Sequence, residues 1–306
     1  MTIKHNPEIN AGVHANIGMD FQKNCTIYLF LEKYNELKNQ RYFIVLEHLE
    51  DIVFGFLEND TELSKIETYQ AKKASKKWTS GTILEIIKKI AETSQSILDD
   101  PHPKSSKFHQ ENYFATNQTV ELKSTVEKQD YICTVNESTE VYEYKNLDQN
   151  IKDKLLKGNK EIIFDSQNKT NFETLKFRFI DLGRSSKAQL DQLNGMFISV
   201  FGDSLTDHKA ALHTFYYALK TIESRLNQGN IAKLTDNKKR IESSEIESIL
   251  NILTTKKLAF DFWRDKGDQI CQDLNINIFD ATSFHLHYHN SFDRFKDINE
   301  DRKSVV

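Results

Sequence analysis

The stretch RYFIVLEHLEDIVFGFLENDTELSKIETYQAK, residues 41–72, decides the fold. Residues 41–46 (RYFIVL) and 51–57 (DIVFGFL) are rich in aromatic and β-branched side chains, which favours two strands. Residues 58–61 (ENDT) are typical of a turn. Residues 66–72 (IETYQAK) are polar at every other position, which indicates a half-buried strand. The stretch therefore predicts three consecutive strands.

Helical patterns lie on both sides of these strands. A first helix is expected from Asp20, which can cap it, to about Tyr34. A second helix, with its N-cap at residue 79 or 80, ends before residues 99–103 (DDPHP), where two prolines exclude helix. Residues 112–116 (NYFAT) predict a fourth strand. The order helix, three strands, helix, strand predicts an α/β layer arrangement with a small mixed sheet.

The rest of the chain mixes both patterns. Its apolar spacing predicts strands at 130–135, 141–144, 160–164 and 175–182, and helices at 150–157, from 185 or 186, at 207–226, at 243–251 and at 255–273. Gln228 and Gly229 form a stop signal for a helix. We therefore expect an N-terminal arm at 1–17, a main domain at 18–228 and a helical region at 229–306 that contacts a partner or another copy of the chain.

Composition indicates an ordinary globular chain. Among 306 residues there are three prolines and ten glycines, which argues against collagen-like, low-complexity and turn-dense all-β proteins. The net charge is −4, so the overall charge does not indicate a nucleic-acid-binding protein. Cys25, Cys133 and Cys271 are too scattered for a disulfide framework or a zinc site. With no signal-peptide or transmembrane pattern, we expect a cytoplasmic protein without a membrane partner.

The average charge conceals a local contrast. Residues 44–63 contain six acidic side chains and no Lys or Arg, whereas residues 65–89 contain seven lysines and two glutamates. These segments are neighbours in the predicted fold. An ordinary salt-bridged surface would explain them; the alternative is a divalent-cation site beside a phosphate-binding lysine patch.

Three residues within this contrast form a candidate active site. Asp51 opens the second strand, while Gln70 and Lys72 lie two apart on the third and therefore share one face. A carboxylate and a second oxygen donor can hold Mg²⁺, and a nearby lysine can orient or deprotonate water or stabilise charge on phosphorus. The Gln-x-Lys pattern alone says little, because residues 167–169 (QNK) repeat it in a polar stretch typical of a turn.

These motifs resemble a known family. The element order with an Asp…Gln-x-Lys constellation resembles the PD-(D/E)xK, restriction-endonuclease-like nucleases. Residues 18–22 (GMDFQ), 47–52 (EHLEDI), 69–72 (YQAK) followed by 78–79 (WT), and 114–117 (FATN) are similar to the effector endonuclease domain of bacterial anti-phage systems. That domain occurs in CBASS effectors fused to a cyclic-oligonucleotide-sensing SAVED domain, and in the nuclease subunit of Lamassu systems, which works with an SMC-like ATPase.

The resemblance implies a role for each site residue. Asp51 would bind Mg²⁺ or Mn²⁺, Gln70 would replace the usual second carboxylate, and Lys72 would be the catalytic lysine. Glu47 or Glu50 would supply further metal ligands. The departure from the family pattern is Gln70, because an amide oxygen is a neutral and weaker ligand, which puts a second metal in doubt.

Other residues carry weaker expectations. Gln22 would approach the site from the first helix, unless it is simply a surface residue, and Glu47 is equally typical of a solvated strand end. Lys73, Lys76, Lys77 and Trp78 would contact DNA, although Trp78 could instead pack at the helix start. His102 and His109 could contact DNA, and His285, His287 and His289 alternate in a pattern that rarely forms a zinc site.

The functional expectation is a metal-dependent DNA endonuclease that acts on double-stranded DNA as the effector of a bacterial anti-phage or anti-plasmid defence complex. Activation would come from an SMC-like ATPase and an accessory subunit, or from homo-oligomer formation, because about 80 residues after 228 leave little room for a sensor. Two alternatives remain: a catalytically silent DNA-binding scaffold with a nuclease fold, and a CBASS-type effector that responds to a cyclic oligonucleotide.

Overall fold

The structure is a computed structural model that describes residues 11–205, 208–225, 233–251 and 269. The expected arm at 1–17 is wrong in part: residues 11–17 belong to the first helix, which begins at Ala11 and therefore is not capped by Asp20. Residues 1–10, Cys271, the three histidines at 285–289 and nearly all of the predicted helix at 255–273 lie outside the described residues. No helix of the described part is long and apolar enough to cross a membrane.

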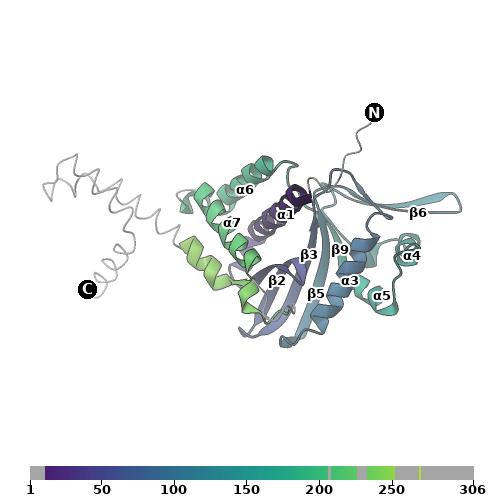
Figure 1. Cartoon of the computed structure of the whole chain (residues 1–306), viewed down its shortest axis with the longest axis horizontal. Helices are drawn as coiled ribbons and strands as arrows, with labels where there is room; N and C mark the ends of the chain where they lie inside the picture. Colours follow the sequence, from purple (N-terminus) through teal and green to yellow (C-terminus); the bar gives the residue numbers. More distant parts are fainter. Residues whose placement is uncertain (1–10, 206–207, 226–232, 252–268, 270–306) are drawn as a thin grey trace.

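A seven-stranded mixed sheet forms the centre of the fold, in the order β10-β1-β2-β3-β5-β9-β8 (Figure 1). The sheet is larger than the small one expected. Its first three strands in sequence pair antiparallel, β5 and β9 continue parallel to β3, and β8 and β10 close the two ends antiparallel. The bounds are β1 (Arg41–His48), β2 (Glu50–Glu58), β3 (Glu62–Lys72), β5 (Lys104–Thr116), β8 (Val141–Glu143), β9 (Leu175–Phe179) and β10 (Arg240–Glu242).

Helices cover both faces of this sheet (Figure 1). Alternation along β3 sends Tyr69 and Ala71 to a core shared with α1 (Ala11–Glu32), α6 (Ser186–Phe201) and α7 (His208–Ser224). Ile66, one step out of phase, packs on the opposite face, where α3 (Leu84–Leu98) lies. The short helices α4 (Gln149–Lys157) and α5 (Ser166–Asn171) extend this second face. Strand β3 is therefore covered by different helices on its two faces, and this arrangement positions the candidate site.

The predicted order of helix, three strands, helix and strand is confirmed, with a short α2 (Tyr34–Leu37) and a two-residue β4 (Trp78–Thr79) added. The predicted N-cap at residue 79 or 80 is wrong: α3 begins after Ile83, and the Ser80 hydroxyl instead bonds the backbone of Lys123. A hairpin of β6 (Val120–Val126) and β7 (Gln129–Val135) joins β4 in a second sheet, and β6 was not expected.

Two local predictions between residues 158 and 171 are wrong. Residues 160–164 are not a strand, because Gly158 turns the chain at a φ of +61° and the Asn159 side chain accepts hydrogen bonds from the next backbone amides. The polar stretch with the second Gln-x-Lys copy is helix α5, started by a capping box on Asp165.

The chain returns to the sheet after the expected boundary near 228, which itself falls among residues that the structure does not describe. A single turn (Asn237–Lys239) leads into β10, which pairs with β1, and a helix follows at 243–251, as predicted. The region expected to be wholly helical therefore also supplies an edge strand to the main sheet.

Candidate active site

Asp51, Gln70 and Lys72 lie together at one end of β2 and β3. The register pairs Ile52 with Tyr69, which sets Asp51 beside Gln70. Oδ2 of Asp51 accepts hydrogen bonds from Gln70 Nε2, from the backbone N of Ala71 at 3.0 Å and from Lys72 Nζ at 3.2 Å. The three residues predicted as the catalytic constellation thus share one carboxylate oxygen as their meeting point.

Lys89 reaches the same place from α3. Its Nζ lies 3.6 Å from Glu50 Oε1 and 3.9 Å from Asp51 Oδ1. From the sequence, Lys89 was predicted only as one of seven lysines in residues 65–89, without a role of its own. An available signal was its position on the helix that crosses between two parallel strands, since such a helix packs across the strand ends. Lys89 adds a second cation, opposite Lys72, to the two acidic side chains.

Glu50 and Gln70 are buried and incompletely satisfied. The Glu50 side chain is 0% exposed, and neither carboxylate oxygen has a hydrogen-bond partner among the described residues. Burial, only partly offset by Lys89, raises the pKa of Glu50 from 4.5 to about 6. Gln70 Oε1 also lacks a partner. Unpaired buried acceptors are costly, so a water molecule or a cation is expected to complete their interactions.

The oxygen atoms at this end of the sheet fit a hard divalent cation. Asp51, Glu50 and the Gln70 amide offer only oxygen ligands, which Mg²⁺ and Mn²⁺ prefer. Within the described ranges no cluster of three His, Cys, Asp or Glu side chains is poised for a metal. A cation at this place would therefore need the Gln70 amide and water as further ligands.

Glu47 stands in a strained turn beside this group. Between β1 and β2 the backbone of Glu47 has a φ of 51° and that of Leu49 a φ of 73°, a region that L-residues seldom adopt. The Glu47 side chain is exposed. Partial desolvation by neighbouring groups, together with the negative charge of Asp51, raises the pKa of Glu47. His48, buried between the two strained residues, holds the turn through Nε2, which lies 3.0 Å from the backbone N of Lys233.

Gln22 is on α1, one turn before Cys25. Its Oε1 is buried and has no hydrogen-bond partner among the described residues, so it is not hydrogen-bonded to the Asp51 group. Helix α1 nevertheless approaches the site, because the charge of Asp51 adds to burial in raising the pKa of the Cys25 thiol. Cys25 and Cys133 are both free thiols.

The predicted DNA-contacting residues follow β3 directly. Lys76 and Lys77 are exposed, and Lys77 pairs with Glu121 at 2.8 Å. Lys73 is half-buried. Trp78 is committed to packing: its Nε1 donates to Thr116 Oγ1 at 2.9 Å and its ring meets Phe114 edge-on at 5.2 Å between centroids. The structural alternative for Trp78 therefore describes its surroundings better than an exposed base-stacking platform.

The two histidines before and within β5 lie elsewhere. His109 is opposite Lys65, near the start of β3, whereas Lys72 ends that strand. His102 precedes β5 and lines a separate pocket at the same distant end of the sheet. Neither residue is placed with Asp51.

No family model, no curated protein and no solved structure matches this chain.

Proposed function

We propose that the chain is a metal-dependent DNA endonuclease that acts on double-stranded DNA as the effector of a bacterial anti-phage or anti-plasmid defence complex. The observation that carries the proposal is a pair of buried acceptors, Glu50 with only the half-exposed Lys89 at 3.6 Å and Gln70 Oε1 without a hydrogen-bond partner among the described residues, beside an aspartate that accepts from Lys72. Buried acceptors that are incompletely satisfied beside a buried aspartate have capacity for a cation. The meander of three antiparallel strands, the crossing helix and the parallel β5 support the nuclease resemblance.

The metal would be held by Asp51, by the amide oxygen of Gln70 and by Glu50, with Glu47 near enough in sequence to contribute through water. When bound, Mg²⁺ would polarise a phosphoryl oxygen and increase the acidity of a water molecule. Asp51 holds Lys72 at 3.2 Å, while 37% of the lysine side chain remains exposed to substrate. From there the ammonium can donate to a non-bridging phosphate oxygen and stabilise the charge that develops on it.

The lysines around the site would bring DNA to it. Lys89 is 53% exposed and faces the same carboxylates, so it can turn from them to a phosphate once a cation balances their charge. Lys73, Lys76 and Lys77 continue the basic stretch along the chain after β3. These contacts are sequence-independent and salt-sensitive, as expected for an enzyme that degrades DNA broadly.

Partner dependence belongs to the same proposal. The overall charge of −4 would give the lone chain a weak general attraction for DNA. An SMC-like ATPase with an accessory subunit, or homo-oligomer formation, would then deliver it to DNA in the cytoplasm. An effector that responds to a cyclic oligonucleotide, and a catalytically silent scaffold, are the competing functions.

The test is plasmid cleavage by the purified chain, alone and with the products of its neighbouring genes, with and without Mg²⁺. We expect Lys72→Ala to lower the cleavage rate at least ~100-fold while the circular dichroism spectrum stays unchanged. The chain provides its own matched control: Lys169→Ala changes the second Gln-x-Lys copy, which lies on α5, and is expected to keep full activity.

Gln70 provides a second, sharper test. Gln70→Glu restores the usual carboxylate and should retain Mg²⁺-dependent cleavage, whereas Gln70→Ala should lose it. Undiminished cleavage by Lys72→Ala would refute the site. DNA binding without Mg²⁺, combined with no nicking even when the partners are present, would favour the scaffold.

A further inference from the structure

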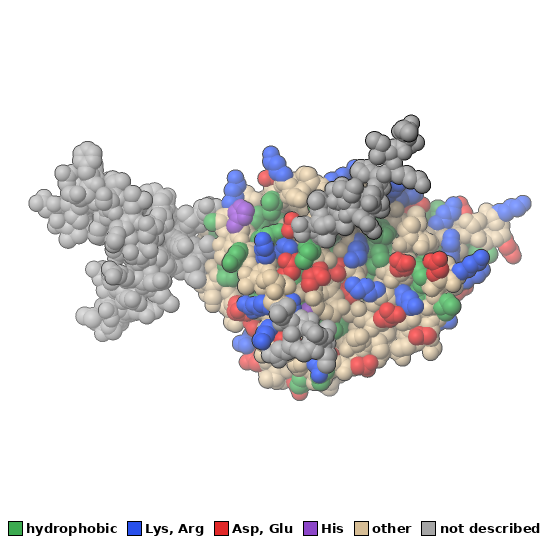
Figure 2. Space-filling model, viewed as in Figure 1, with side chains coloured by type: hydrophobic (Ala, Val, Ile, Leu, Met, Phe, Trp, Pro, Cys, Tyr) green, Lys and Arg blue, Asp and Glu red, His purple; other side chains and the backbone are tan. Residues whose placement is uncertain are grey.

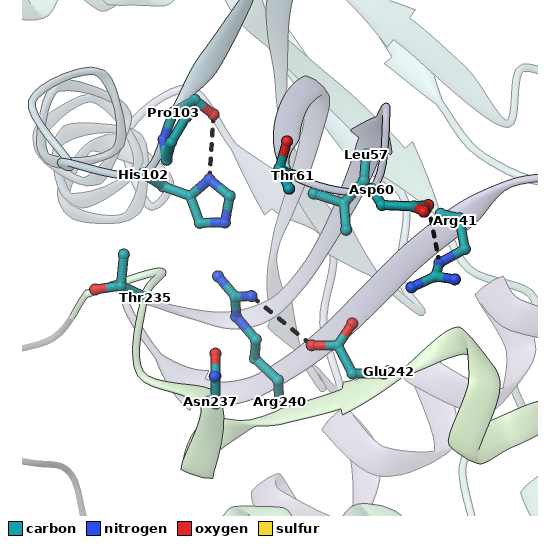
Figure 3. A pocket seen from close by; sticks show the side chains of 10 residues that line it. All are labelled: Arg41, Leu57, Asp60, Thr61, His102, Pro103, Thr235, Asn237, Arg240 and Glu242. Carbon is teal, nitrogen blue, oxygen red and sulfur yellow. Dashed lines mark hydrogen bonds and ion pairs between the residues drawn. The ribbon is translucent and has the colours of Figure 1, made fainter.

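A polar pocket lies at the opposite end of the β1–β3 meander from Asp51. It has a volume of about 390 Å³, within the usual range for small-molecule sites. Its walls come from the start of β1, the β2–β3 turn, the segment before β5 and the segment around β10 (Figure 3). Leu57, which lines it, is six positions along β2 from Asp51, about 20 Å at the rise of an antiparallel strand.

Arg240 forms the base of this pocket, and not all of its hydrogen-bond donors are satisfied there. The residue is 7% exposed, and its Nε is buried without a hydrogen-bond partner among the described residues. One terminal nitrogen donates to the carbonyl of Leu234, and the other lies 3.7 Å from Glu242. Figure 3 shows the guanidinium directed into the pocket, toward His102. An arginine in a cavity with donors to spare indicates an anionic ligand.

The position of Arg240 is fixed by packing. Its guanidinium lies over the Phe43 ring, 4.0 Å from the centroid. Phe43 in turn lies against Gly55, where an added Cβ would come within 2.2 Å of the ring. The carbonyl that Arg240 binds belongs to Leu234, whose amide donates to Asp100 at 2.8 Å. The donor is thus pre-organised, which lowers the entropic cost of binding.

The pocket also presents acceptors and a second guanidinium. His102 Nδ1 lies 3.1 Å from the carbonyl of Pro103, so Nδ1 carries the proton and Nε2 is an acceptor. Arg41, 58% exposed, forms a 3.4 Å ion pair with Asp60 at the rim. Glu242 and Asp60 are acceptors for hydroxyl groups. Two cations for an anionic group, with carboxylates beside them for hydroxyls, match a sugar phosphate.

We propose that this pocket binds a small phosphate ester of a sugar, such as a nucleoside monophosphate. Arg240 and Arg41 would bind the phosphate, and Glu242, Asp60 and His102 would accept hydrogen bonds from sugar hydroxyls. The site is independent of the proposed metal site and of the nuclease assignment, because no residue is shared between them.

The test is isothermal titration of the full chain with adenosine 5′-monophosphate, ribose 5-phosphate and adenosine. We expect both phosphate esters to bind and adenosine not to bind. Arg41→Ala should weaken binding at least tenfold. Arg184→Ala, which removes the same side chain from an exposed position outside the pocket, should leave binding unchanged. Arg240→Gln should abolish binding, with folding checked by circular dichroism.

Three outcomes would overturn the proposal. The first is the absence of binding by either phosphate ester at millimolar concentration. The second is binding that Arg41→Ala leaves intact. The third is binding that Asp51→Asn abolishes, because the ester would then occupy the candidate metal site. Arg41 is exposed, so its variant keeps the test decisive even if Arg240→Gln does not fold.

Discussion

Two buried glutamates on neighbouring strands of this sheet differ in how completely their carboxylates are paired. Glu67 on β3 is 2% exposed and fully paired: it accepts from Lys33, from Tyr69 Oη at 2.7 Å and from Lys65 at 2.7 Å. Glu50 on β2 is 3% exposed, and its oxygens have no hydrogen-bond partner among the described residues. Burial raises the pKa of both, but two lysines reverse the shift at Glu67, while Glu50 stays at about 6.

The difference distinguishes a structural carboxylate from a functional one. Around Glu67 the tyrosines of β3 and β5 stack at 4.5 Å, and a second carboxylate, Glu111, joins through Lys65 and Lys176. Lys176 also pairs with Glu143 at 3.1 Å, so three lysines and three glutamates balance their charges within this network. At Glu50 the nearest cation is Lys89, at 3.6 Å and half-exposed. The buried carboxylate of Glu50 is therefore less completely paired than that of Glu67 and can accept a further ligand.

The largest expected effect breaks the closed network. Glu67→Gln leaves Lys33, whose side chain is 14% exposed, without its counter-charge, and should destabilise the protein by about 3–5 kcal/mol. Glu50→Gln should be neutral or stabilising by up to about 2 kcal/mol, because it removes a carboxylate with a raised pKa. Urea denaturation at pH 7 measures both. Equal losses in the two variants would remove the distinction between them.

The pH dependence of stability isolates Glu50. Its folded-state pKa of about 6 exceeds the reference 4.5, so the native state binds a proton more tightly than the unfolded state. The free energy of unfolding should therefore rise by about 2 kcal/mol as pH falls from above 6 to 4.5. The measurement is the difference between the wild type and Glu50→Gln across that range, which cancels other titrating groups. A difference that does not change with pH would contradict it.

Mg²⁺ should act on the same carboxylate as a proton does. If the open oxygens hold the ion, 10 mM Mg²⁺ should raise the melting temperature of the wild type by a few degrees at pH 7. The rise should shrink in Glu50→Gln and vanish in Asp51→Asn. Glu67→Asp, a conservative change in the closed network, is the control and should respond like the wild type. A rise that survives Asp51→Asn would place the ion elsewhere.

The smallest effect is expected outside both clusters. Lys77 and Glu121 form an exposed pair, so Lys77→Ala should change stability by less than about 0.5 kcal/mol. If Lys77 contacts DNA, the same variant should lower the salt dependence of binding by about one phosphate contact. Fluorescence anisotropy over a range of salt concentrations gives this slope. A slope that does not change would remove Lys77 from the DNA surface.

Local rules predicted the parts of the fold that depend on neighbours in sequence. Strand alternation placed Gln70 and Lys72 on one face, and the strand start placed Asp51 beside them; all three proved adjacent. Lys89 could not be assigned, because its place depends on how α3 crosses the sheet. The pairing of β10 with β1 joins residues far apart in sequence. A strand of three residues is too short to show a periodicity from which it could be predicted.

The β1–β10 pairing has a consequence for synthesis of the chain. β1 ends at His48 and its partner begins at Arg240, so residues 49–239, well over half of the 306-residue chain, are translated between them. At roughly 5–20 residues per second, β1 waits about 10–40 s on the ribosome with its outer backbone groups unpaired. A bare, apolar strand edge is a template for aggregation. We therefore expect the outer edge of the hairpin that carries Asp51 to be prone to aggregation until β10 has been made.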